Sequence, residues 1–132
     1  MAFTKIETCL ICEAARPELR NKHILIGFFG MAPYKQITIG DFKLPVSLCF
    51  VFCGGAGRAG RHTIGIRLSD PNGKVISNPQ NAPDVAGPII ARTYTNLFMG
   101  FHGSVTVPGE YQVTLIVDGK KHYSTTLDLL AA

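Results

Sequence analysis

Long apolar stretches and long helical patterns are both missing from this sequence of 132 residues. No apolar run reaches the roughly 18 residues that a membrane-spanning helix needs. The N-terminal residues MAFTKIETCLICEA also lack the basic stretch, long apolar run and small-residue cleavage site of a secretory leader. Fourteen glycines and eight prolines interrupt the short apolar runs, whereas a helical domain would need longer periodic stretches. The sequence therefore predicts a soluble, cytoplasmic, all-β protein that does not enter a membrane.

Catalytic motifs are missing as well. The histidines at positions 23, 62, 102 and 122 show no HxH or HExxH spacing, and no serine or cysteine lies in a recognisable nucleophile elbow. The acidic side chains show no defensible pairing either, and positions such as Glu7, Glu13, Asp70 and Asp84 are typical of turns, caps or surfaces. We therefore expect no enzyme and no cofactor.

The strongest hairpin signal lies between Val107 and Leu130. Apolar or aromatic side chains alternate with mainly polar ones in its first half, at Tyr111, Val113, Leu115 and Val117. Asp118-Gly119 then suits the positive φ angles of a type I′ turn, and the alternation resumes after it. Because Tyr111 stands at the start of a late strand, we expect its hydroxyl to bond the neighbouring loop backbone, as in the tyrosine corner of immunoglobulin-like sandwiches.

Short strand patterns fill most of the remaining sequence. They cover residues 5–12, 22–29, 34–39, 46–53, 63–68, 74–77 and 89–101. Pro17 argues against a helix over residues 13–20, which we expect as a loop, and residues 77–88 form the longest expected loop. Residues 46–53 are expected at the centre of a sheet, in a hairpin with residues 63–68. These patterns predict one domain over residues 1–132, a two-layer antiparallel β-sandwich of about eight or nine strands that is immunoglobulin-like.

Several strands offer apolar side chains on both faces. Those opposite the presumed core faces are Cys9, Ile11, Cys49, Val51 and Phe98. Loops such as residues 77–88 would cover them in one explanation, which we favour. Association with another subunit would cover them in the other explanation.

The glycine-rich segment 54–62, GGAGRAGRH, contains a GxGxxG pattern after an apolar strand. That motif binds a dinucleotide only where a helix follows, and here another strand pattern follows, so we favour a hairpin loop over a cofactor site. Arg58, Arg61 and His62 could bind a phosphate or another anion together with the glycine amides. No stacking aromatic or base-reading element accompanies them, which argues against nucleic acid. The net charge of +4 decides neither way, because a mild excess also serves solubility.

Four cysteines form two pairs, Cys9 with Cys12 and Cys49 with Cys53. Two such pairs can form a tetrahedral zinc site. However, a spacing of three residues on a strand points Cys9 and Cys12 to opposite faces, and Cys49 and Cys53 lie too far apart along an extended strand for a disulfide. We therefore expect buried or half-buried free thiols and no metal. A redox-active pair is not indicated, because that chemistry uses a helix N-terminus.

Several motifs together resemble a family of small bacterial all-β proteins that is defined only as a domain of unknown function. They are turns and core strands: Cys12-Glu13, Gly27-Phe28-Phe29-Gly30, Ile66-Arg67-Leu68, Asp70-Pro71-Asn72-Gly73-Lys74, Asn96-Leu97, Pro108-Gly109-Glu110-Tyr111 and Asp118-Gly119. The resemblance spans nearly the whole sequence, implies a bacterial or phage origin, and supplies no catalytic or binding residue.

The sequence thus favours a non-enzymatic module that binds a protein partner or self-associates through its sandwich faces or loops. The alternative is a domain that binds a small anion or ligand through segment 54–62. Arg58, Arg61 and His62 would then form the site, with Arg67 and Arg92 nearby.

Overall fold

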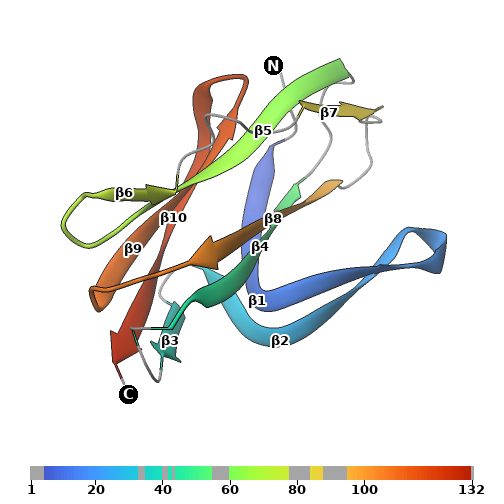
Figure 1. Ribbon diagram of the computed structural model, residues 1–132. Coiled ribbons are helices and arrows are strands. Elements are labelled where there is room, and N and C mark those ends of the chain that lie inside the picture. The colour runs from blue at the N-terminus through green and yellow to red at the C-terminus, as the bar shows by residue number, and fades with distance from the viewer. Residues whose placement is uncertain are drawn as a thin grey trace.

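The computed structural model describes residues 5–32, 35–39, 42, 44–54, 60–77, 84–87 and 95–131. Ten strands within these residues form two facing layers, which confirms the all-β prediction (Figure 1). One short 3-10 turn, η1 (Leu19–Asn21), occurs, and no helix of the described residues is long and apolar enough to cross a membrane. The strands are β1 (Ile6–Glu18), β2 (Lys22–Ala32), β3 (Lys35–Ile39), β4 (Val46–Gly54), β5 (Gly60–Ser69), β6 (Val75–Ser77), β7 (Asp84–Gly87), β8 (Thr95–Gly103), β9 (Gly109–Val117) and β10 (Lys120–Ala131).

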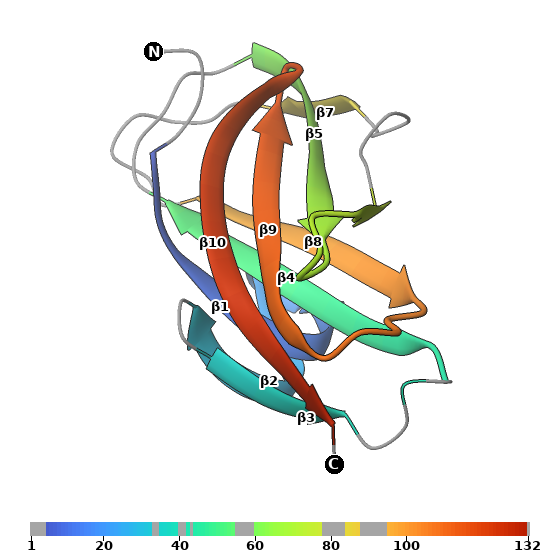
Figure 2. The ribbon, with the colours of Figure 1, turned by 90° about the vertical axis from the view of Figure 1, so that its left-hand side faces the viewer.

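The first sheet has the strand order β2-β1-β4-β8. The second has the order β3-β10-β9-β5-β6, and β7 also pairs with β5. The strands of the two layers cross one another in Figure 2. All neighbours are antiparallel except β3, which runs parallel to β10 and so departs from the predicted antiparallel arrangement. Because β3 follows β2, a strand of the opposite sheet, no hairpin turn fixes its direction.

The predicted hairpin between residues 46–53 and 63–68 is wrong. These residues lie in β4 and β5, which belong to different sheets. β4 pairs with β1 and β8 on its two edges, so its predicted central position is confirmed. β5 pairs with β9, β6 and β7 instead. Strands that follow one another along the chain often pair, but the contacts that form a sandwich join strands that are distant in sequence.

The core lies between the sheets and confirms two of the predicted apolar faces. Leu48, Phe50 and Phe52 of β4 are buried in it, as are the alternate residues of β9 that begin at Tyr111. Cys9 and Ile11 of β1 also face this core, which corrects the prediction that they lie on the outer side. Apolar residues are consecutive from position 9 to 12, so hydrophobicity alone did not distinguish the two faces of β1.

The C-terminal hairpin follows its sequence signals. Asp118 and Gly119 have φ angles of 52° and 78°, as a type I′ turn requires, and β9 pairs with β10 on either side of them. The buried Tyr111 donates its hydroxyl to the carbonyl oxygen of Val107 at 2.6 Å. The predicted tyrosine corner is therefore present, and it fixes the entry of β9 into the core.

Candidate binding surface

The predicted anion site lies mostly beyond what the structure describes. Arg58 falls outside the described residues, and so does Arg92. Arg61 and His62 belong to β5, where their backbones pair with Ala86 and Val85 of β7, so this end of segment 54–62 is strand and not loop. Their side chains are outside the description, and an anion site there stays a prediction.

The predicted thiols come together on the neighbouring strands β1 and β4. Cys12 lies directly opposite Cys49 in the register, and its thiol donates to the carbonyl oxygens of Ala14 at 3.2 Å and of Cys49 at 3.7 Å. Cys9 faces the core while Cys12 faces outward, as their spacing predicted. All four cysteines are free, with Cys53 half-buried and the others buried. No group of three or more histidine, cysteine or acidic side chains is placed to hold a metal ion among the described residues.

Burial disfavours the thiolate form of these cysteines. Desolvation raises the pKa of Cys9 to about 12 and the pKa of Cys49 to about 11, with nearby cysteines adding to both shifts. The same cause raises the pKa of Cys12 and of Cys53. Because the thiolate is the nucleophile and the metal ligand, these cysteines are poorly suited to either role near neutral pH.

Ser47 and His102 form a second pair with chemical potential. They are cross-strand neighbours of β4 and β8, and the Ser47 Oγ lies 2.6 Å from the His102 Nδ1. Both residues are exposed on the open surface of the first sheet. The hollow found among the described residues lies elsewhere, at the β1–β2 turn, and could not bring a substrate to this pair. We therefore interpret the contact as a cross-strand pair that stabilises the sheet surface.

The outer face of the first sheet carries an apolar cluster that the chain itself covers. Its buried members are Cys12, Cys49 and Val51. Ala15 and Leu25, from the β1–β2 hairpin, pack against this cluster. The ring of His23 also stacks on Phe98 of β8, with centroids 3.9 Å apart and planes inclined by 21°. The cover seen in the described residues is thus a hairpin, while residues 78–83 and 88 of the predicted covering loop lie outside the described residues.

This hairpin contradicts the expected loop over residues 13–20. β1 runs on through Pro17 to Glu18 and pairs with β2 along that whole length. Its pairing with β4 ends at Cys12, so the residues beyond belong to a two-stranded ribbon, where proline is tolerated at a sheet edge. We call residues 13–28 the arm. Figure 1 shows the arm projecting sideways from the two sheets.

An irregularity marks the base of the arm. The register with β2 shifts between Ile11 and Cys12, which leaves Phe29 without a residue opposite it. Gly30 beside it has a φ of 132°, and Gly27 has a φ of 64°. A side chain at Gly27 would meet the Glu13 side chain at 2.6 Å. Bulges bend and twist a strand, and these glycines permit the sharp turn by which the arm leaves the sheet.

The arm covers the sheet with one face and exposes apolar side chains elsewhere. The β1–β2 hairpin carries five of the seven large apolar side chains that are exposed among the described residues: Leu19, Ile24, Ile26, Phe28 and Met31. Leu19 is 85% exposed and Phe28 is 56% exposed. Apolar groups concentrated on one projecting element are typical of an interaction site. Residues 24–29 are apolar at nearly every position, whereas a solvated strand would alternate, and this pattern could have indicated the surface.

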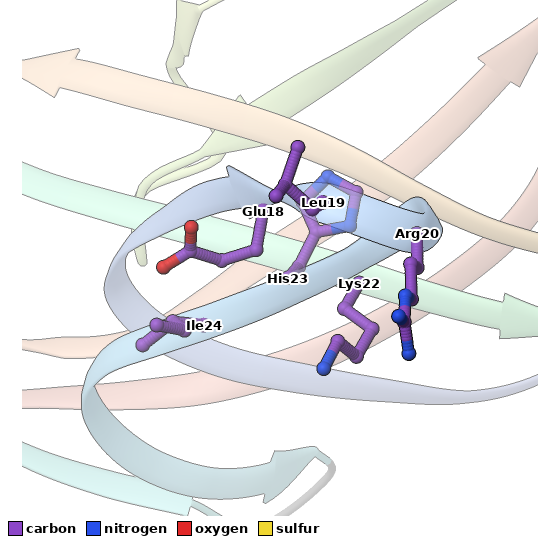
Figure 3. A pocket seen from close by; sticks show the side chains of 6 residues that line it. All are labelled: Glu18, Leu19, Arg20, Lys22, His23 and Ile24. Carbon is purple, nitrogen blue, oxygen red and sulfur yellow. The ribbon is translucent and has the colours of Figure 1, made fainter.

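The tip of the arm adds charge to this surface. A hollow of about 470 Å³ is lined there by Glu18, Leu19, Arg20, Lys22, His23 and Ile24 (Figure 3). The side chains of Arg20 and Lys22 point to one side of the arm, whereas those of Leu19 and His23 point to the other. Arg16 forms an exposed ion pair with Glu18 at 2.9 Å, which contributes little stability. The tip is therefore a mixed basic and apolar surface.

Comparisons with known proteins identify a family but no function. A model described as "Family of unknown function (DUF6941)" matches residues 7–130. The sequence matches no curated protein. A solved structure of Pseudomonas fluorescens alkylpurine DNA glycosylase AlkC, bound to DNA containing an abasic site analog, is similar over 73% of this chain at 18% identity, with a TM-score of 0.43. This chain covers 28% of that one, and similarity at this level gives no basis for carrying its activity over.

Proposed function

The chain belongs to DUF6941, a family of unknown function, and we propose that it is a non-enzymatic protein-binding module whose contact surface is the arm. The single observation that carries the proposal is the exposed apolar surface of the β1–β2 hairpin. Full burial of a large apolar side chain contributes about 1.5–3 kcal/mol, so a partner that covers this surface gains a substantial part of its binding energy from the arm.

The way in which the arm is held also supports binding. Its inner side chains Ala15 and Leu25 pack on the outer cluster, and His23 stacks on Phe98. These contacts hold the outer side chains in place before a partner arrives. A surface that is ordered in advance loses less conformational entropy on binding.

The remaining features suit a bacterial cytoplasmic module with an immunoglobulin-like sandwich. The hydrogen bond of Tyr111 to Val107 supports the immunoglobulin-like expectation. Four free cysteines suit a reducing compartment. The protonated state of the buried thiols supports binding over nucleophilic catalysis.

A comparison of two paired variants tests the proposal. The arm variant combines Ile24→Thr with Phe28→Thr, and the control variant combines Leu44→Thr with Val75→Thr at exposed apolar positions outside the hairpin. Threonine keeps a high strand propensity, so both variants should stay folded, which circular dichroism can check.

The measurement is chemical crosslinking of each chain inside its host cells, followed by mass spectrometry of the species formed, including any that contain a second copy. We expect the arm variant to lose the dominant crosslinked species by about tenfold, because its apolar contacts are gone, while the control retains it. Equal yields from the arm variant and the wild-type chain would contradict a binding role for the arm.

A further inference from the structure

We propose that Cys12 and Cys49 form a reversible disulfide beneath the arm, with a low-molecular-weight disulfide as the oxidant. This inference goes beyond the proposed function, because it concerns thiols on the covered side of the arm and would stand if the arm bound no partner. The register of β1 and β4, the contacts of the two thiols and the cover that the arm provides all support this bond.

The strand register places the two cysteines within bonding distance. Cys12 of β1 lies directly opposite Cys49 of β4 in an antiparallel pair. Directly opposite residues of such a pair have Cα atoms about 4.5 or 5.5 Å apart, depending on the type of pair. A disulfide joins Cα atoms roughly 4.4–6.8 Å apart, so either type of pair permits the bond. The backbone therefore needs no large rearrangement for the two sulfur atoms to join.

The two side chains also lie on the same face of the sheet. Both belong to the buried outer cluster, together with Val51. The Cys12 thiol donates to the carbonyl oxygen of Cys49 at 3.7 Å, and the two thiols are themselves hydrogen-bonding partners. Cysteines can be bridged only where their Cβ atoms point toward one another, and this pair meets that condition.

The other cysteine pairs do not meet these conditions, although the structure describes all four cysteines. Cys9 faces the core, so the sheet itself separates its thiol from those of Cys12 and Cys49. Cys53 shares the outer cluster with Cys49 but stands four positions further along β4, roughly 13 Å away in an extended strand. The pair that can bond thus takes one cysteine from each of the two sequence pairs.

The arm covers this thiol pair. Ala15 and Leu25 of the arm pack against the cluster that contains both thiols. Cys12 is 0% exposed and Cys49 is 7% exposed. Desolvation raises the pKa of both thiols, and the thiolate is the form that attacks a disulfide. The closed arm therefore slows their oxidation.

The arm can uncover the thiols without unfolding of the sheets. The pairing of β1 with β4 ends at Cys12, and the arm continues from there as a two-stranded ribbon. A two-stranded hairpin is marginally stable at best in water, and elements of low local stability open more readily than the core. An opened arm gives water and small solutes access to both thiols. We therefore expect arm opening to set the rate of oxidation.

The oxidation consists of two thiol–disulfide exchanges. One cysteine loses its proton, and its thiolate attacks a sulfur of the small disulfide. That S–S bond breaks, one thiolate leaves and takes up a proton, and a mixed disulfide remains on the chain. The second cysteine then loses its proton and attacks the chain-bound sulfur, which forms the bond between Cys12 and Cys49 and releases the second small thiol. Two protein thiols are oxidised, one small disulfide is reduced to two thiols, and no net proton is exchanged.

A variant in which the two cysteines stand alone gives the first test. Cys9→Ala combined with Cys53→Ala leaves Cys12 and Cys49 as the thiols of the chain, and circular dichroism checks its fold. After incubation with excess oxidised glutathione, mass spectrometry of the intact variant should show the loss of two hydrogen atoms and no retained glutathione. Dithiothreitol should restore the original mass. Addition of Cys12→Ser is the matched control, because it should leave Cys49 able to form only a mixed disulfide.

The alternative outcomes of this test are clear. Glutathione retained on both cysteines, or a mass that never changes, would overturn the inference. Fragmentation of peptides from the oxidised wild-type chain gives an independent readout that needs no variant, and there Cys12 must be linked to Cys49. The oxidised variant should also unfold at a temperature higher by on the order of 10 °C, because the bond closes a loop spanning 37 positions. A lower unfolding temperature would show that the strands accept the bond only with strain, against the register argument.

Two single replacements test whether the arm limits the reaction. Phe98→Ala removes the ring that stacks on His23 of the arm, so oxidation by glutathione should become about fivefold faster. Tyr111→Phe weakens the core and leaves the arm contacts intact, so it should oxidise at the wild-type rate. Equal acceleration in both variants would place the reaction in the globally unfolded chain and would overturn a site formed beneath the arm.

Discussion

Replacement of Phe98 by alanine should loosen the arm selectively. Phe98 is half-buried on β8, packs against the outer cluster and stacks on His23 of the arm. The pairing of β1 with β4 ends at Cys12, so within the described residues the arm makes few contacts with the sheet. Removing the Phe98 ring eliminates the stack and opens the space under the arm.

The structure sets the size of this effect. Replacement of a fully buried phenylalanine by alanine costs about 3–5 kcal/mol, so a half-buried ring should cost on the order of 2 kcal/mol. The stacked geometry of the His23 and Phe98 rings accounts for roughly 1 kcal/mol of this. That part concerns the arm alone, because opening the arm breaks the stack without unfolding the sheets. A local loss of about 1 kcal/mol corresponds to roughly fivefold faster exchange of the arm amides.

Hydrogen exchange followed by mass spectrometry can resolve the two contributions. Peptides from residues 13–28 should exchange about fivefold faster in Phe98→Ala, while peptides from β9 should change only with the global stability measured by urea unfolding. Phe28→Ala is the matched control, since that ring points to solvent and its loss should leave arm exchange nearly unchanged. Faster exchange in β9 with an unchanged arm would refute the role assigned to the stack.

Two further predictions concern the core that supports the arm. Tyr111→Phe leaves the carbonyl of Val107 without its donor and should lower the free energy of unfolding by about 1–2 kcal/mol in urea titrations; a loss below about 0.3 kcal/mol would show that the corner contributes nothing. The raised pKa of Cys9, about 12, means that the unfolded chain loses its thiol proton first, so stability is fully present below about pH 9 and falls as the pH rises toward 12. Unfolding measured between pH 8 and about pH 11 should show a steeper decline for the wild-type chain than for Cys9→Ala, and parallel declines would contradict this assignment.

The parts of the fold that local chemistry determines were predictable from the sequence. Asp118-Gly119 and the alternation around it specify a hairpin within a short segment, and β9 and β10 form it. Tyr111 could be assigned because its role depends on a loop only a few residues away. By contrast, the partner of β4 depends on β1 and β8, which are distant in sequence, so the predicted hairpin with β5 failed.

The arm could not be predicted because its signals oppose one another. Pro17 normally ends a regular element, and it is accommodated here because β1 has already left β4 and pairs with β2 alone. The bend depends on positive φ angles at Gly27 and Gly30, which the sequence permits but does not require. The side chains of the predicted anion site, Arg58, Arg61 and His62, lie outside the described residues.

The apolar composition of β2 is the physical basis of the proposed binding role. A strand that is apolar on both faces is stable in water only if both faces are covered. The chain covers one of them, because Leu25 and His23 lie on the outer cluster and on Phe98. This arrangement covers the outer side of the first sheet and leaves Ile24, Ile26 and Phe28 of the arm exposed. A partner that covered these side chains would remove their apolar surface from water, which is the physical basis of the proposed binding role.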